Sequence, residues 1–151
     1  MKATKTPALL LSAFALCAVG FAIWKDTAGP KQPQSAPVAP RQVVVYYFHG
    51  DAHCAACDRI ESLGRSAVQG AFQDELRAGL VVWSPVNTDR KPNEHFVSDY
   101  GLLTRSIVVA EFRNGQRKRW KNLDRVWELL DDSKAFTRYV QDEVAAYVGA
   151  P

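Results

Sequence analysis

The chain has 151 residues, of which 47% are hydrophobic and 23% are charged. This length suits one globular domain, and the composition excludes a wholly disordered or collagen-like chain. The net charge of +3 comes from the region before residue 41, where four lysines stand against one aspartate. The rest of the chain carries 15 basic and 15 acidic side chains. Such a balanced region argues against a dedicated nucleic-acid binder.

The N-terminal region contains a long uncharged apolar run over residues 7–24. This run can form a single membrane-spanning helix and is longer than a signal-peptide core of about 7–15 residues. Two lysines precede it, and the lysine that follows it is next to Asp26. This charge bias predicts a cytoplasmic N-terminus. We therefore expect residues 1–25 to be an anchor in the bacterial inner membrane, with the domain in the periplasm. Cleavage after a small residue such as Gly20 is the alternative.

A proline-rich segment follows the predicted anchor. Residues 26–41 contain four prolines and almost no large apolar side chain, which indicates an extended, semi-rigid linker. The folded domain is expected over residues 42–150. Outside the cytoplasm its thiols meet an oxidising compartment, where a C-x-x-C pair can form and break a disulfide.

The first half of the domain has a strand–helix–strand pattern. Residues 42–48 are β-branched and aromatic without alternation, which predicts a strand buried on both faces. Apolar residues at helical spacing predict a helix from Ala55 to Ala78, with a possible kink at Gly70. Residues 80–86 are expected to form a second strand.

The second half adds a hairpin and a helical tail. A short helix is expected within residues 93–100, with Asn93 as its cap. Strands over 106–112 and 116–123 flank an Asn-Gly pair, which is a strong hairpin signal. The tail, residues 124–148, is expected to be helical with a break at Asp131–Asp132. This order of elements predicts an α/β, thioredoxin-like fold, with a central mixed sheet flanked by helices.

Two cysteines lie where the first strand meets the first helix. The predicted helix start at Cys54 places unpaired backbone N–H groups near its sulfur, which stabilise a thiolate. Cys57 lies one turn further on and can resolve a mixed disulfide. His53 can tune the thiolate by sharing its proton. We therefore predict a membrane-tethered thiol–disulfide oxidoreductase with catalytic Cys54, Cys57 and His53.

Three alternatives use the same residues differently. The cysteines can form a static disulfide, although so short a loop gains little stability from a cross-link. His49 and His53 can instead join Cys54 and Cys57 as ligands of copper or zinc in a metal-delivery module. The domain can also serve as a non-catalytic accessory subunit of a reductase.

Three long stretches resemble a known bacterial family. From Val43 to Tyr147 the chain is similar to the thioredoxin-like family labelled nitrophenyl-compound nitroreductase subunit ArsF, through YYFHGDAHCAACDRIES, WSPVNTDRKPNEHFVSDYGL and WKNLDRVWELLDDSKAFTRYVQDEV. The resemblance implies a thioredoxin fold with the family's cysteine pair on Cys54 and Cys57. The chain has no G-x-G-x-x-G motif for a flavin or nicotinamide. We therefore expect no cofactor and do not predict nitroreduction by this chain.

The sequence also departs from ordinary thioredoxins. Those proteins have a cis-proline before the third strand, and here Arg105 and Ser106 stand near that position. The missing proline favours the metal alternative. The first strand also lacks a carboxylate that could accept a proton. The expected partners are an exported thiol or disulfide protein, or a membrane electron-transfer protein, and no nucleic acid.

Overall fold

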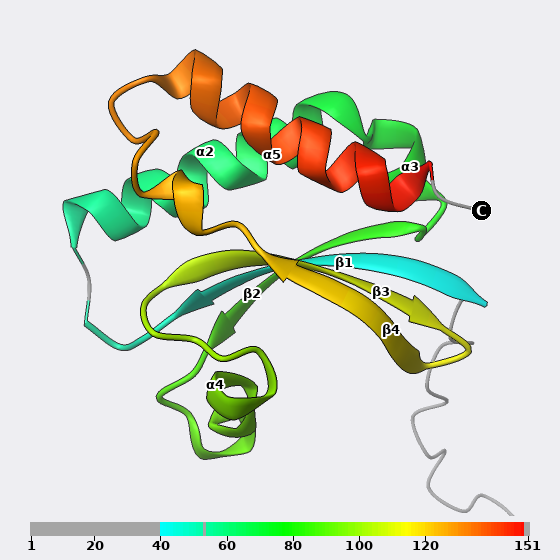
Figure 1. The fold of residues 1–151 in the computed structure, drawn as a ribbon, viewed down its shortest axis with the longest axis horizontal. Coiled ribbons are helices and arrows are strands. Elements are labelled where there is room, and N and C mark those ends of the chain that lie inside the picture. Colours follow the sequence, from blue (N-terminus) through cyan, green and yellow to red (C-terminus); the bar gives the residue numbers. More distant parts are fainter. Residues whose placement is uncertain (1–39, 53, 150–151) are drawn as a thin grey trace, which may run out of the picture. The chain divides into compact units, whose positions relative to one another are not determined.

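Four strands form one mixed sheet in the computed structural model, which describes residues 40–52 and 54–149. The strands are β1 (Arg41–His49), β2 (Val81–Asn87), β3 (Ser106–Arg113) and β4 (Gln116–Asn122). Their order in the sheet is β2-β1-β3-β4. β1 is parallel to β2 and antiparallel to β3, and β4 is antiparallel to β3 (Figure 1).

Helices cover both faces of this sheet. The α-helices are α2 (Ala55–Ala71), α3 (Gln73–Arg77), α4 (His95–Asp99) and α5 (Ser133–Val148), with short 3-10 helices η1 (Lys91–Asn93) and η2 (Asp124–Val126). In Figure 1, α2, α3 and α5 lie on one side of the sheet and α4 lies on the other. This strand order and helix placement confirm the predicted thioredoxin-like fold.

β1 is buried on both faces, as its unbroken apolar sequence predicts. Val43 and Val45 belong to the larger core beneath α2 and α5. Phe48 belongs to a second, mainly aromatic cluster with Tyr100 and Val108. The strand therefore ends between two packed layers, and the loop that follows it starts from a well-fixed point.

The predicted anchor, residues 1–25, and nearly all of the linker lie outside the described residues. In the described part of the chain, no helix is both long enough and apolar enough to cross a membrane.

Two helix predictions need correction. The helix expected over 55–78 is divided at Phe72, whose backbone leaves the helical region with φ −123° and ψ 39°. The break thus lies at Phe72 and not at Gly70. Phe72 is only 7% exposed, so the break coincides with burial of its ring. Asn93 does not cap α4 through its side chain. It lies in η1, and its side-chain amide donates to the carbonyl oxygen of Asn87 at 2.8 Å.

The tail breaks where it was predicted to break. Asp132 caps α5 and accepts hydrogen bonds from the backbone N–H groups of Lys134 and Ala135, at 3.1 and 3.0 Å. The segment before it forms η2 and turns instead of the predicted regular helix. The Asp131–Asp132 pair therefore lies at the start of the C-terminal helix, with Asp132 as its cap.

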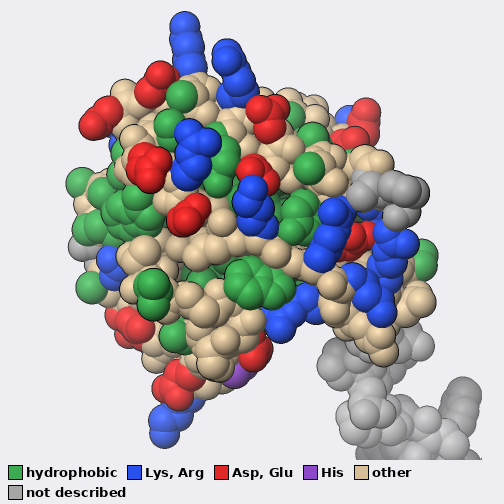
Figure 2. Space-filling model, viewed as in Figure 1, with side chains coloured by type: hydrophobic (Ala, Val, Ile, Leu, Met, Phe, Trp, Pro, Cys, Tyr) green, Lys and Arg blue, Asp and Glu red, His purple; other side chains and the backbone are tan. Residues whose placement is uncertain are grey.

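The predicted Asn-Gly hairpin joins β3 to β4. Asn114 and Gly115 both have positive φ values, 51° and 75°, as this tight turn requires. β4 is exposed along most of its length and carries several basic side chains. Figure 2 shows Lys and Arg side chains gathered on the side where this hairpin lies. Trp120 on β4 is 39% exposed, whereas Trp83 and Trp127 are half-buried.

Gly64 lets α2 pack closely on the sheet. A Cβ atom at this position would lie 2.5 Å from Cδ1 of Ile107 and 3.0 Å from the ring of Trp83. Gly64→Ala is therefore expected to lower the free energy of unfolding by about 1–3 kcal/mol, as overpacking does. Urea denaturation measures this loss.

Gly70→Ala is the matched control in the same helix. A Cβ atom there meets nothing within 4 Å. Alanine should raise stability at this position by about 0.5–1 kcal/mol, because glycine is a poor helix former. Equal changes in stability for the two substitutions would show that close packing at Gly64 does not exclude a side chain there.

Candidate active site

Cys54 and Cys57 form a disulfide at the N-terminus of α2, with their Cα atoms 5.1 Å apart. The bend between β1 and α2 delivers Cys54 in an extended conformation (φ −144°, ψ 148°), as the residue that caps the helix. Cys57 lies in the first helical turn. The pair is therefore oxidised in this structure, and the sequence-predicted cysteines are brought together.

The two cysteines differ in their exposure to solvent. Cys54 is exposed, whereas Cys57 is only 3% exposed. The Sγ atom of Cys54 accepts a hydrogen bond from the backbone N–H of Cys57 at 3.1 Å. This N–H group and the helix dipole both favour negative charge on the Cys54 sulfur. An incoming reactant can therefore reach Cys54, and the site stabilises its thiolate.

Tyr47 on β1 is hydrogen-bonded to the first turn of α2, which carries Cys57. Its hydroxyl donates to the carbonyl oxygen of Cys57 at 2.8 Å, in a buried hydrogen bond. Burial is the main cause that raises the pKa of Tyr47 to about 12, so the hydroxyl stays protonated near neutral pH. The Tyr47 ring also stacks on the rings of His49 and Trp83, at centroid distances of 5.6 and 6.5 Å.

Arg105 contacts the disulfide directly, from the loop before β3. Its Nη1 atom lies 3.0 Å from Sγ of Cys57 and 4.0 Å from Sγ of Cys54. Its Nη2 atom donates to the carbonyl oxygen of Ala52. The guanidinium therefore bridges the β1–α2 loop and the buried sulfur. The sequence identified Arg105 only as a residue near a missing proline and did not predict this contact.

The backbone around Arg105 is held in place from the core side. The indole N–H of Trp127 donates to the carbonyl oxygen of Arg105 at 2.8 Å. Ser106, the next residue, begins β3 and pairs with Phe48 near the end of β1. No peptide bond among the described residues is cis. At the position where ordinary thioredoxins have a proline, this chain therefore has a loop held by hydrogen bonds, from which the Arg105 side chain contacts the cysteines.

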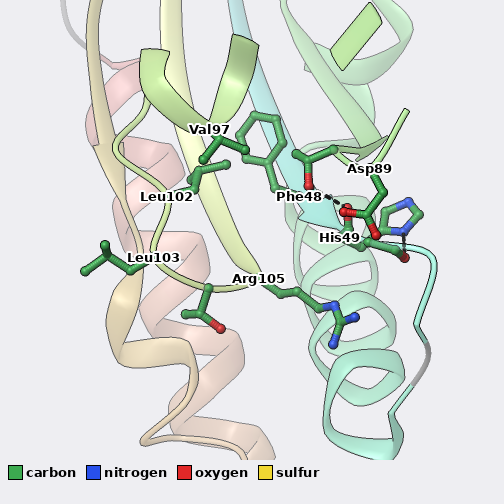
Figure 3. A pocket seen from close by; sticks show the side chains of 10 residues that line it. Phe48, His49, Asp89, Val97, Leu102, Leu103 and Arg105 are labelled. Atoms are coloured by element: carbon green, nitrogen blue, oxygen red, sulfur yellow. Dashed lines mark hydrogen bonds between the residues drawn. The ribbon is translucent and has the colours of Figure 1, made fainter. Parts of the chain in front are cut away.

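A cleft of about 320 Å³ lies beside Arg105 (Figure 3). One side of it is apolar and includes Val97, Leu102 and Leu103, and His49 and Asp89 lie on the other side. Leu103 is 99% exposed and Val97 is 43% exposed. These two side chains therefore leave the apolar side of the cleft open to solvent.

A polar network fixes the loop that leads to Cys54. Asp51 does not cap α2: its carboxylate accepts from the side-chain amide of Asn87 at 2.7 Å and pairs with Arg90 at 3.2 Å. Its backbone N–H donates to the carboxylate of Asp89 at 2.7 Å. Asp89 lies so close to Gly50 that a Cβ there would meet Oδ2 at 2.6 Å. These hydrogen bonds join the loop before Cys54 to the end of β2 and the turn that follows it.

The structure places only one of the two predicted histidines. His53 lies outside the described residues. The Nδ1 atom of His49 lies 3.0 Å from the carbonyl oxygen of Gly50, and its ring stacks on Tyr47. Within residues 40–52 and 54–149, no three His, Cys, Asp or Glu side chains are arranged to hold a metal ion. His49, Cys54 and Cys57 are all described, so these three do not form a metal site in the oxidised state.

Comparisons with known proteins assign neither a family nor a function to this chain. No family model matches the chain, and no curated protein matches it. A mutant thioredoxin from Halobacterium salinarum NRC-1 is similar in structure, at 17% sequence identity and a TM-score of 0.39. The match covers 73% of this chain and 78% of that one. The thioredoxin-like fold is therefore assigned from this chain's own strand order and helix placement.

Proposed function

We propose that this protein is a thiol–disulfide oxidoreductase that works outside the cytoplasm, tethered by residues 1–25. The observation that supports it best is the unequal cysteine pair at the start of α2. Cys54 is exposed and caps the helix, whereas the bonded Cys57 is 3% exposed. An exposed, stabilised sulfur next to a protected partner is the arrangement that two-step disulfide exchange requires.

The exchange has two steps that balance in electrons. In the reduced protein, the Cys54 thiolate attacks one sulfur of a substrate disulfide, and the other substrate sulfur leaves as a thiolate. Cys57 then attacks Cys54, forms the intramolecular disulfide and expels the remaining substrate thiolate. Two electrons pass from the protein to the substrate. The oxidised protein in this structure runs the same steps in reverse when a substrate dithiol attacks Cys54.

We infer that the partner is another exported protein with a thiol or disulfide, or a membrane electron-transfer protein. The exposed apolar side chains of Leu103 and Val97 line the cleft beside Arg105, and Arg105 contacts both sulfurs. A protein substrate would cover these side chains as its sulfur reaches Cys54. The role proposed for His53 is to share the proton of Cys54 and so raise its thiolate fraction.

Membership of the ArsF family is part of the same proposal and rests on the three sequence stretches that resemble it. The proposal assigns disulfide exchange, not nitroreduction, to this chain, because the residues brought together here are two cysteines and an arginine. No flavin or nicotinamide takes part in the steps described above.

Trapping of mixed disulfides tests this function. In a Cys57→Ser variant the first attack should proceed and the second should fail, so substrate proteins should accumulate as adducts on Cys54. A matched Cys54→Ser variant should form none. The chain has a third cysteine, Cys17, in the predicted anchor. Both variants carry Cys17→Ser, so that this thiol contributes no adducts. Non-reducing electrophoresis of membrane extracts detects the adducts. Equal amounts of adduct in both variants would contradict the proposal.

A further inference from the structure

The guanidinium of Arg105 lies against the buried sulfur rather than the exposed one. Nη1 is 3.0 Å from Sγ of Cys57, inside hydrogen-bonding range for sulfur, and 4.0 Å from Sγ of Cys54. The second Nη atom is held by the carbonyl oxygen of Ala52. The helix N–H donates to the sulfur of Cys54 and not to that of Cys57. Arg105 therefore reaches both sulfurs, but its short contact is with Cys57, and this donor carries a full positive charge.

This contact gains strength when the disulfide opens. A disulfide sulfur is neutral and accepts only a weak hydrogen bond, whereas a thiolate accepts a charge-assisted one. Cys57 is 3% exposed, so water cannot easily solvate a charge that forms there. An unpaired buried charge is costly, and a contacting guanidinium lowers that cost.

We propose that Arg105 is a catalytic residue that stabilises Cys57 as the leaving thiolate when the Cys54–Cys57 disulfide is attacked. In this step an incoming thiolate forms a bond to Sγ of Cys54, and the Cys54–Cys57 bond breaks. The electron pair of that bond leaves on Sγ of Cys57, beside the guanidinium, and no proton moves. The inference rests on the proposed function and deepens it.

The charged groups near this site act in opposite directions. Burial is the main cause that raises the pKa of Tyr47, whose hydroxyl bonds the Cys57 carbonyl; the carboxylate of Glu61 raises it further, Arg105 lowers it, and Asp58 raises it. Both carboxylates lie on α2, the helix that carries Cys57. Arg105 contacts the Cys57 sulfur directly. A disulfide whose leaving thiolate is stabilised is reduced faster, and its reduced form is more stable. Arg105 should therefore make the pair a stronger oxidant.

Arg105→Gln tests this role in the full chain, with Cys17→Ser to remove the third thiol. The rate constant for reduction by dithiothreitol should fall about tenfold, as expected when the leaving group loses its cationic partner. At a pH where the Cys57 thiol is ionised in both chains, the equilibrium with glutathione should move about tenfold toward the disulfide, which corresponds to a potential about 30 mV more negative. Arg105→Lys keeps the charge and should show intermediate values.

Arg77→Gln is the control for loss of one positive charge. Arg77 is exposed on α3 and pairs with Asp74, so this variant should match the wild type in rate and equilibrium. A second readout is the alkylation rate of Cys57 against pH in a Cys54→Ser chain. Arg105→Gln should raise the pKa of Cys57 by about one unit, because a positive charge in contact with a thiol lowers its pKa by at least about that much.

The outcomes separate this inference from the proposed function. If the wild-type disulfide is reduced reversibly and Arg105→Gln matches it within twofold in rate, equilibrium and Cys57 pKa, the role of Arg105 is wrong and the function stands. If no reversible couple exists in the wild type, the function itself fails. If Arg105→Gln does not fold, Arg105→Lys and the alkylation profile of the Cys54→Ser chain decide. In that case, Arg105→Lys values equal to those of the wild type in rate, equilibrium and Cys57 pKa would overturn the proposal.

Discussion

Cys54→Ser is expected to reduce thiol–disulfide exchange to the background level. Cys54 supplies the exposed sulfur of the pair, and its backbone N-cap position gives that sulfur a helix N–H donor. A serine hydroxyl has nearly the same shape and can keep the cap hydrogen bond, but it is not ionised near neutral pH and cannot form a disulfide. The fold should therefore survive while the chemistry is lost. Turnover of a disulfide substrate in the presence of a thiol reductant measures the effect.

Cys57→Ser is the companion variant for this measurement. It should also fail in full turnover, but it should still show one rapid round of adduct formation, because its Cys54 is intact. Stopped-flow thiol release separates these two behaviours. Substrate turnover by Cys54→Ser at the wild-type rate would exclude Cys54 as the attacking group. A burst of equal size in both variants would show that another group reacts first.

Glu111→Gln is expected to cost about 3 kcal/mol of stability, as the loss of one partner from a buried ion pair does. Glu111 is 2% exposed, and its carboxylate accepts from Nε of Arg41, Arg113 and Arg119 at 3.0, 2.9 and 2.7 Å. Arg41 also donates to the carbonyl oxygen of Tyr147 at 2.6 Å. This carboxylate therefore ties the start of β1 to the β3–β4 hairpin, and through Arg41 to α5. Chemical denaturation at pH 7 measures the loss.

Glu143→Gln provides the matched control. Glu143 pairs with Lys121 at 2.6 Å, but the Lys121 side chain is 49% exposed. A pair of this kind typically contributes less than about 1 kcal/mol. A loss at Glu111 no larger than the loss at Glu143 would show that the three-arginine cluster contributes little to stability.

The Glu111 contribution should depend on pH in a defined direction. Burial alone would raise the pKa of Glu111, but hydrogen bonds from Arg119, Arg113 and Arg41 outweigh it and lower the pKa from 4.5 to about 2. A lowered folded-state pKa means that the stabilisation is fully present above about pH 4.5 and is lost as the pH falls toward 2. The stability gap between wild type and Glu111→Gln should therefore shrink over that interval. A constant gap would contradict the role of the charge.

Local sequence patterns predicted the sheet because the signals for its strands are strong. The unbroken β-branched and aromatic run became β1, and Asn114–Gly115 became the hairpin turn. The break at Phe72 was missed because it depends on burial of that ring in the core, which helical spacing alone does not reveal. Asn93 was misassigned because its side chain bonds the carbonyl of Asn87 instead of the α4 backbone.

The site was predictable only where its chemistry lies in one local motif. Cys54 and Cys57 are three residues apart at a strand–helix junction, so their pairing could be inferred. Arg105 is 48 residues from Cys57, and the loop before β3 brings the two together. That loop is held in part by Trp127, another 22 residues along the chain. The absence of proline near Ser106 was the available signal, and it indicated that the position was unusual without showing that an arginine would reach the sulfurs.

Redox titration of the wild-type chain tests the central claim most directly. The full chain, with Cys17→Ser, is equilibrated in glutathione buffers of graded ratio, and free thiols are trapped and counted by mass spectrometry. We expect one reversible two-electron transition of the Cys54–Cys57 pair, with the same midpoint in metal-free and copper-exposed samples. A pair that stays oxidised at every ratio would indicate a static disulfide. Thiols that copper protects at a ratio of one ion per chain would instead indicate a metal-binding module.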